Sequence, residues 1–201
     1  LLARRLMYWQ VYLHKTSLAA EILLVKTLKR FQYLVQNGKE ALRSEHILYP
    51  IMQTTSSDSL EDKVLFHYLS LDDSDMIQLL KSWTKHADLV LRLLSSQLLY
   101  RNLPKIKISD TAFSIAEIEK KKAHLGGLAQ DQSASPYFVF SGTISNQTYV
   151  SDETQLLILE KNGKVFPIAE IIQYLDFKQF STPVVKHYLC YPKRVNSLII
   201  T

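Results

Sequence analysis

The densest group of chemically useful side chains lies near the start of the chain, in the segment YWQVYLHK, residues 8–15. Arg4, Tyr12 and Lys15 recur at helical spacing, so on a helix they would share one stripe. Arg4 and Tyr12 would stand roughly 12 Å apart along the axis, the scale of an extended triphosphate with its sugar. Such a stripe could bind a nucleotide: tyrosine would pack against sugar or base, while Arg4, His14 and Lys15 would contact phosphate oxygens.

The same segment has a simpler interpretation as a packing surface. Aromatic residues at helical spacing usually belong to a core, and Tyr8, Trp9 and Tyr12 could be core residues with polar tips. His14 and Lys15 would then be solvated. On pattern alone, packing is favoured over binding.

Signatures of a complete catalytic site are absent from the sequence. The five glycines form no GxxxxGK phosphate loop, and neither a GxSxG elbow nor an HExxH zinc motif occurs. Cys190 is the single cysteine and cannot build a thiolate cluster. In a strand, Cys190 and His187 would point to opposite faces, so we expect a buried thiol rather than a nucleophile. We expect no catalytic residue and no metal ligand in this chain.

Composition is that of a globular protein: 201 residues, 47% of them hydrophobic and 21% charged. The net charge of +5 and the pI of about 9.1 are compatible with an anionic ligand but do not by themselves indicate nucleic acid. One cysteine excludes an internal disulfide, and the sequence has no membrane-length apolar run and no signal peptide. We expect a cytoplasmic protein that does not bind membranes.

The elements that position these residues are predicted from hydrophobic periodicity. Residues 1–36 lack Pro and Gly and repeat apolar residues at helical steps, which predicts one long helix ending at Asn37-Gly38. A second long helix should begin at a cap on Asp72 or Asp73 and end at Pro104. Shorter helices are expected over residues 39–53, 60–71 and 110–124, and a short strand over 105–108.

Beyond residue 135 the periodicity becomes strand-like. Strands are predicted in YFVFSGTIS, QTYVSD, QLLILEK, KVFPI and VVKHYLCYPK, with a hairpin at Asn162-Gly163 and a short helix in AEIIQYLDF. The predicted fold is mainly α: a long-helix bundle followed by a small α+β C-terminal lobe with an antiparallel or mixed sheet. The expected domains are a helical region over 1–109 and the lobe over 110–201.

Three segments resemble one enzyme family. RRLMYWQVYLHK, residues 4–15, resembles the helix after the catalytic core of HD-domain phosphohydrolases, in the deoxynucleoside triphosphate triphosphohydrolase branch, where Arg, seven residues and Tyr-x-His-Lys recur. YRNLPK, residues 100–105, resembles a later YRNL-x-K segment of that branch, and HYLCYPKR, residues 187–194, resembles its closing strand. The order and spacing agree over most of the chain.

The resemblance implies a metal-dependent enzyme that hydrolyses a (deoxy)nucleoside triphosphate or related phosphoester by activating a water with Mg, Mn, Fe or a similar divalent ion. In that branch a histidine, a His-Asp pair and a later Asp hold the metal, all upstream of the first motif. This chain has no His-Asp dipeptide, and its first helix starts in mid-pattern without a cap. We therefore expect the C-terminal part of such an enzyme, inactive by itself.

The resemblance assigns roles to few residues. Arg4 matches an arginine that contacts substrate phosphate and Tyr12 a tyrosine against the substrate sugar, whereas Leu13 departs from the polar residue common in relatives. Four residues match positions that help bind a regulatory nucleotide in activated relatives: His14, Lys15, Arg101 and Lys105. For Arg101 and Lys105, an exposed basic helix end favoured by the helix dipole is an equally good interpretation.

Two other functions fit the same sequence. One is a non-enzymatic regulatory or protein-interaction module that binds a partner through basic and aromatic helix faces. The other is an enzyme-derived scaffold that has lost activity. Because relatives in the resembled branch are homo-oligomers, and because the first helix would expose part of an apolar stripe, we expect dimers or larger assemblies.

Overall fold

The computed structural model describes residues 7, 10–11, 13–38, 48, 51–52, 62–125, 134–146, 157–167 and 184–193. Its helices are α2 (Lys15–Gln36), α4 (Asp62–Ser70), α5 (Asp73–Trp83), α6 (Leu89–Leu99), α7 (Ile115–Ala123) and α9 (Ser135–Phe138). Its strands are β1 (Lys105–Ser109), β2 (Phe140–Asn146), β3 (Leu157–Leu159), β4 (Val165–Pro167) and β5 (Val184–Tyr191). The predicted class, mainly α with a small antiparallel sheet, is confirmed.

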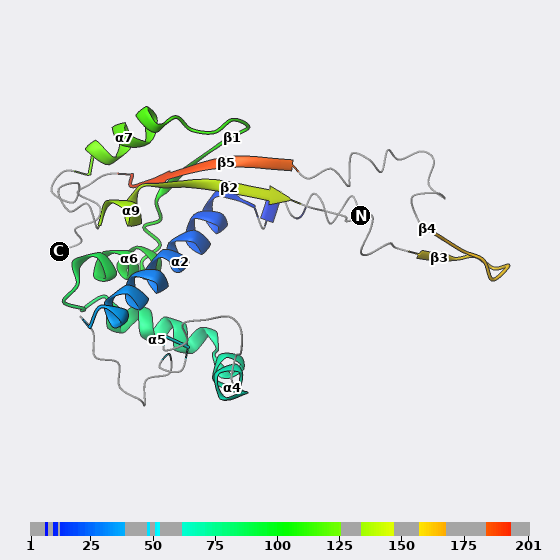
Figure 1. Ribbon diagram of the computed structural model, residues 1–201, viewed down its shortest axis with the longest axis horizontal. Coiled ribbons are helices and arrows are strands. Elements are labelled where there is room, and N and C mark those ends of the chain that lie inside the picture. Colours follow the sequence, from blue (N-terminus) through cyan, green and yellow to red (C-terminus); the bar gives the residue numbers. More distant parts are fainter. Residues whose placement is uncertain are drawn as a thin grey trace.

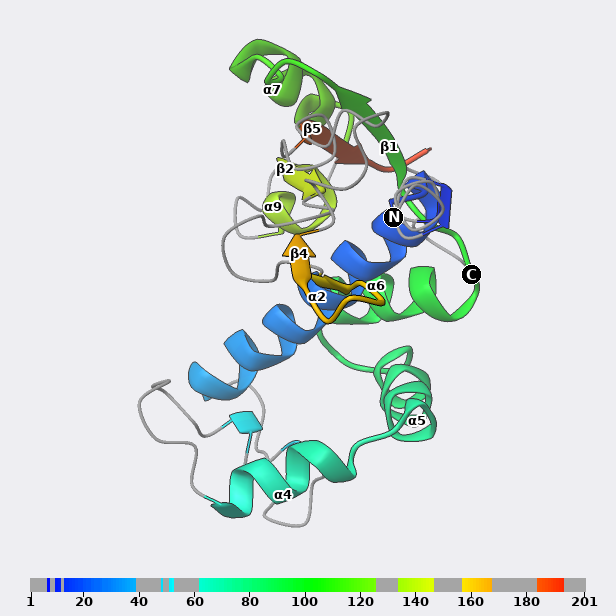
Figure 2. The ribbon, with the colours of Figure 1, turned by 90° about the vertical axis from the view of Figure 1, so that its right-hand side faces the viewer.

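A three-stranded antiparallel sheet of order β1-β5-β2 separates two groups of helices. Figure 1 shows α7 on one side of this sheet and α2 and α6 on the other, and the turned view in Figure 2 agrees. Helices α5 and α4 lie farther from the sheet, beyond α2 and α6. β1, which falls within the predicted region 1–109, pairs with β5 near the far end of the chain.

Helix α2 is the central element because it contributes to all three clusters of buried apolar side chains. Leu18 and Ala19 pack with the sheet, and Leu23 packs with α6 and the α9–β2 corner. Phe31 and Leu34 pack with α5 around Trp83, where the Phe31 and Trp83 ring centroids are 4.6 Å apart. The helical layer and the sheet are therefore fixed relative to each other through α2.

The prediction of one uninterrupted helix over residues 1–36 is wrong. The backbone of His14 is extended, with φ −61° and ψ 137°, and its side chain caps α2 by accepting a hydrogen bond from the Thr16 N–H. Histidine is not among the favoured N-cap residues, so hydrophobic periodicity alone could not reveal this break. The predicted end is confirmed: Asn37 caps the helix and Gly38 follows with φ +64°.

The predicted second long helix is two helices. Asp72 begins α5 with a reciprocal capping box that includes Asp75, as expected for an aspartate cap. The chain then leaves the helix after Trp83, and Asp88 caps α6. α6 ends at Leu99, so it does not extend to Pro104 as predicted.

Most of the described elements in the second half of the chain confirm the predictions. β1, β5 and helix α7 form where predicted, and β3 and β4 form a separate two-stranded hairpin. The hairpin loop has three residues rather than two: Glu160 pairs with Lys164, and Gly163 adopts φ +82°. The segment before β2 forms the helical turn α9 instead of a strand, because Pro136 suits a first helical turn.

Several predicted elements lie outside the described residues. They are the strand in QTYVSD, the helix in AEIIQYLDF and most of the helix over 39–53. Within the described part of the chain, no helix combines the length and apolarity needed to cross a bilayer.

Candidate functional site

The two residues predicted to bind substrate, Arg4 and Tyr12, lie outside the described residues. Their roles stay predictions. The four residues matched to a regulatory nucleotide site are all described, and they fall into two pairs on neighbouring elements.

His14 and Lys15 stand at the N-terminus of α2 with exposed side chains. Because His14 Nδ1 accepts the Thr16 N–H at 3.3 Å, a neutral ring carries its proton on Nε2, where it can be donated to a ligand. The first turn of α2 contains no acidic residue, although acidic side chains favour that position. The helix dipole and the Lys15 ammonium together make this end of α2 electropositive.

Arg101 lies on the connection from α6 to β1 and Lys105 is the first residue of β1; both side chains are exposed. α6 ends in a Schellman motif: Asn102 N–H donates to Gln97 O at 2.9 Å and Arg101 N–H to Leu98 O at 3.2 Å. The position that usually holds glycine is occupied by Arg101, with φ +55°. Among described residues other than glycine, Arg101 alone has a positive φ.

The two pairs are linked through packing of their elements. Ile106, next to Lys105, belongs to the same buried cluster as Leu18 and Ala19 in the first turns of α2. The first residues of β1 and of α2 are thus brought to one region. The four polar side chains themselves are not joined by a hydrogen bond or ion pair in the described structure.

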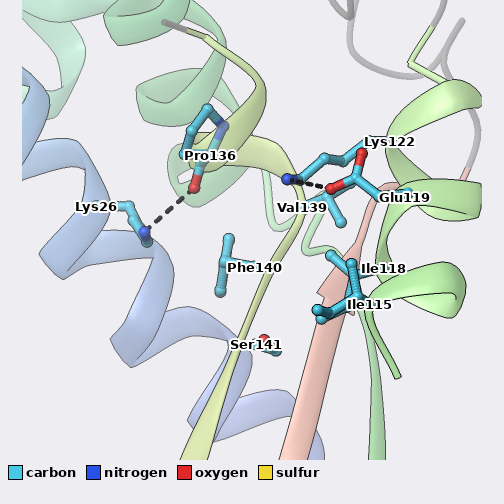
Figure 3. A pocket seen from close by; sticks show the side chains of 9 residues that line it. All are labelled: Lys26, Ile115, Ile118, Glu119, Lys122, Pro136, Val139, Phe140 and Ser141. Carbon is cyan, nitrogen blue, oxygen red and sulfur yellow. Dashed lines mark hydrogen bonds and ion pairs between the residues drawn. The ribbon is translucent and has the colours of Figure 1, made fainter. Parts of the chain in front are cut away.

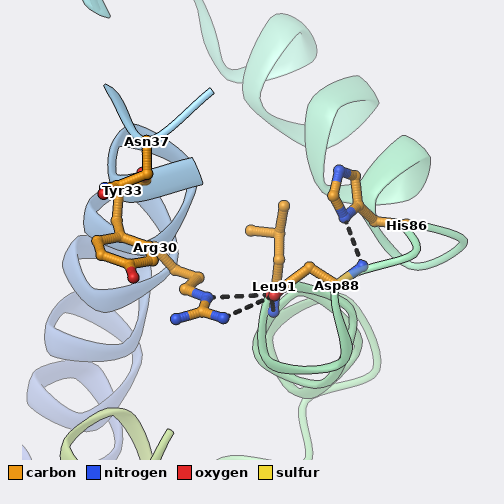
Figure 4. Close-up of polar contacts among 6 residues, drawn as sticks. All are labelled: Arg30, Tyr33, Asn37, His86, Asp88 and Leu91. Atoms are coloured by element: carbon orange, nitrogen blue, oxygen red, sulfur yellow. Dashed lines mark hydrogen bonds and ion pairs between the residues drawn. The ribbon is translucent and has the colours of Figure 1, made fainter. Parts of the chain in front are cut away.

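A buried ion pair that the sequence analysis did not foresee joins α2 to the corner between α5 and α6 (Figure 4). Arg30 Nε lies 3.1 Å from Asp88 Oδ1, and Arg30 Nη2 lies 2.6 Å from Asp88 Oδ2. Asp88 Oδ1 also accepts the Leu91 N–H at 2.8 Å, and the Asp88 N–H donates to His86 Nδ1 at 2.9 Å. No sequence pattern distinguishes Arg30 from the neighbouring Lys29, so the pair could not be predicted from the sequence.

The charges of this pair stabilise each other. Burial by itself would raise the pKa of the Asp88 carboxyl, but hydrogen bonds from Arg30 and the Leu91 N–H hold it below its usual value. The hydrogen bond to Asp88 raises the pKa of Arg30 despite burial. Both carboxylate oxygens of Asp88 bind groups of the protein, so we interpret this pair as an architectural contact between α2 and the α5–α6 corner.

Cys190 behaves as a buried structural thiol. Its side chain is fully buried, and burial raises the pKa of the thiol to about 12, an effect that nearby Lys26 only partly offsets. A thiol with that pKa carries almost no thiolate at neutral pH, so it is a poor nucleophile. The predicted burial of Cys190 is confirmed.

The described residues do not form a metal centre. In the described part of the chain, no group of three or more His, Cys, Asp or Glu side chains is placed to hold an ion. These residues therefore do not fit the divalent metal centre that the family resemblance implies.

No protein-family model matches this chain, but a curated protein and solved structures are similar to it. The chain is 30% identical over 204 residues to the uncharacterized protein YwfO of Bacillus subtilis, an alignment that covers 96% of this chain and 44% of YwfO. Its structure resembles that of a phosphohydrolase from Bacteroides thetaiotaomicron with a TM-score of 0.79 and 33% identity. That match covers 95% of this chain and 48% of the phosphohydrolase. The chain has a phosphohydrolase-like fold and spans about half the length of the proteins it matches.

Proposed function

We propose that this chain forms part of a phosphohydrolase, and more specifically the C-terminal part of an HD-type enzyme that hydrolyses (deoxy)nucleoside triphosphates. The observation that carries the proposal is the likeness to the Bacteroides phosphohydrolase, which extends over 95% of the chain at 33% identity. The motif in residues 4–15 and the YRNLPK segment support the finer assignment.

The described residues supply no metal centre, so the proposal places the divalent ion and the attacking water on residues outside this chain. The ion would polarise the phosphoryl group and activate the water. The contribution of this chain would be binding: Arg4 would neutralise phosphate charge, and Tyr12 would pack against the sugar. Such contacts hold the phosphate in the orientation that hydrolysis requires.

The regulatory part of the proposal concerns the region where α2 and β1 begin. Lys15, the His14 ring and the N-terminus of α2 offer an anion complementary charge and N–H donors. Arg101 is held in a left-handed conformation although glycine would fit that position without strain. We propose that His14, Lys15, Arg101 and Lys105 bind the phosphates of an activating nucleotide.

The test of substrate binding is Arg4→Ala in the full-length protein. Loss of a charge-assisted phosphate contact costs about 1.5–3 kcal/mol, which lowers kcat/KM by roughly ten- to a hundredfold. Lys81→Ala, which removes an exposed lysine from α5, is the matched control and should keep normal turnover. Unchanged kcat/KM in Arg4→Ala would remove Arg4 from the substrate site.

A protein-interaction role is favoured by one specific surface. Helix α4 leaves four large apolar side chains exposed: Leu65, Phe66, Tyr68 and Leu69 at 42%, 70%, 61% and 72%. Clustered exposed apolar residues mark protein contacts. We propose that α4 contributes to a homo-oligomer of the enzyme; in a purely regulatory module it would bind another protein instead.

The two roles of α4 are separated by light scattering on the full-length protein and its Phe66→Ser variant. A wild-type oligomer that dissociates on Phe66→Ser supports self-association. A monomeric wild-type protein would contradict the oligomer and leave α4 as a surface for a different partner.

A further inference from the structure

A pocket separate from the proposed nucleotide site opens between α7 and the start of β2 (Figure 3). Its volume is about 350 Å³, near the lower end of the range for small-molecule sites. The apolar part of its wall is formed by Ile115, Ile118, Val139 and Phe140. None of the residues assigned to substrate or regulatory nucleotide lines it.

One side of the pocket carries the positive charge of Lys26. Lys26 of α2 lies on the side of Phe140 opposite to Ile115 and Ile118, and its ammonium is 4.9 Å from the centre of the Phe140 ring. Lys26 Nζ donates one hydrogen bond, to Pro136 O at 3.1 Å. Within the described part of the chain, no carboxylate pairs with Lys26.

Burial, assisted by nearby Lys29, lowers the pKa of Lys26, which shows that its surroundings disfavour the charged form. A partly buried ammonium with unused N–H donors is stabilised by an anion. The second lysine of the pocket, Lys122, already has a partner, because its Nζ lies 2.8 Å from Glu119 Oε1. Lys26 is therefore the group that an anionic ligand would contact.

We propose that this pocket binds a small amphipathic anion, with a carboxylate or phosphate-ester head group at Lys26 and a short aliphatic body against Ile118 and Val139. The charge of Lys26 selects the head group, and the apolar wall selects the body. A volume of about 350 Å³ is sufficient for such a ligand. This site goes beyond the proposed hydrolysis and does not depend on it.

The test uses 4,4,4-trifluorobutyrate as the probe, observed by ¹⁹F NMR in the presence of the full-length protein. Its small size and its single ion-pair anchor at Lys26 predict a Kd on the order of 1 mM. The uncharged analogue 4,4,4-trifluorobutanol should bind at least about tenfold more weakly, because it cannot form the charge-assisted bond. Butyrate and butyl phosphate as competitors then distinguish carboxylate from phosphate-ester head groups, and inorganic phosphate tests whether the aliphatic body matters.

Two variants and a control locate the binding. Lys26→Gln removes the charge and should weaken trifluorobutyrate binding about tenfold or more. Ser141→Phe places a large side chain at an exposed position of the pocket wall and should abolish binding while Lys26 stays intact. Lys29→Gln removes an exposed lysine three residues away on α2 and should bind the probe normally.

Equal binding of trifluorobutyrate to the wild-type, Lys26→Gln and Ser141→Phe proteins would overturn the proposal. So would the absence of saturable ¹⁹F broadening in the wild-type protein at millimolar probe. A folded Ser141→Phe protein, checked by circular dichroism, keeps the test decisive if Lys26→Gln does not fold.

Discussion

Arg101 has a backbone conformation that does not suit its side chain. A residue with a Cβ pays roughly 1 kcal/mol or more in the left-handed region, which is why glycine usually follows a helix end. Here φ is +55° and the side chain is exposed, so no buried contact of Arg101 explains its presence. A ligand contact would explain why arginine occupies the position.

We predict that Arg101→Gly raises the free energy of unfolding by about 0.5–1 kcal/mol and, in the full-length protein, reduces the proposed activation by nucleotide. Urea denaturation measures the first effect and initial rates with and without activator the second. Tyr100→Gly is the control, because Tyr100 has φ −95° and gains nothing from glycine. A less stable Arg101→Gly protein would show that the arginine side chain stabilises the fold.

The ion pair between Asp88 and Arg30 leads to a second prediction about single residues. Asp88→Asn keeps an oxygen that can accept the Leu91 N–H but leaves the Arg30 guanidinium buried without its counter-charge. Loss of one partner of a buried pair costs about 3–5 kcal/mol. The double variant Arg30→Met/Asp88→Asn should be more stable than Asp88→Asn, since no charge is then stranded. Chemical denaturation of the three variants checks this order, and a double variant less stable than Asp88→Asn would contradict it.

The same pair should make stability depend on pH in the acidic range. The pKa of the Asp88 carboxyl is lower in the folded than in the unfolded protein, so its contribution is fully present above the unfolded value of about 3.9. That contribution is lost as the pH falls through the folded pKa. The stability gap between wild type and Asp88→Asn should therefore shrink below about pH 4, as followed by urea unfolding at several pH values. A gap independent of pH would contradict the ion pair.

At the scale of the elements, the contact of β2 with β5 depends on a glycine. Gly142 faces Tyr188 in the register of the two strands, and a Cβ at Gly142 would lie 2.5 Å from the Tyr188 hydroxyl oxygen. The ring of Tyr188 thus covers the position where other residues carry a side chain.

Gly142→Ala should consequently destabilise the protein by about 1–3 kcal/mol, because Tyr188 must move out of its packed position. Tyr188→Val in the same background should recover part of this loss, which a double-mutant cycle in thermal unfolding would measure. Additive effects of the two substitutions would mean that Tyr188 does not oppose the new methyl group.

Elements with local signals could be predicted from the sequence. Asn37-Gly38, Asp72 and the Asn162-Gly163 turn each bond to neighbours within a few residues, so their effect is visible in a short window. The breaks at His14 and between α5 and α6 were missed because periodicity continues through them. The second break is stabilised by Arg30, 58 residues away in sequence.

The candidate site was only partly predictable for the same reason. Motifs placed His14, Lys15, Arg101 and Lys105 in the chain, but the packing of β1 on α2 is a non-local contact. The pocket beside Lys26 depends on how α2, α7 and β2 are arranged. No short stretch of sequence contains that information.

At the scale of the whole molecule, helix α2 links the sheet, the helical layer and the proposed sites. It joins the sheet to the helical layer, begins with the proposed regulatory residues and carries Lys26 into the separate pocket. The chain corresponds to about half of the phosphohydrolase it resembles. Hydrolysis is therefore proposed as a property of the full-length protein, to which this chain contributes binding residues.

One assay tests that central claim most directly. The full-length protein and this 201-residue chain are each incubated with deoxynucleoside triphosphates and Mg²⁺ or Mn²⁺, and released nucleoside and triphosphate are quantified by chromatography. We predict metal-dependent release by the full-length protein and none by the chain. No release by the full-length protein, with both metals and a panel of activating nucleotides present, would contradict the proposed triphosphohydrolase.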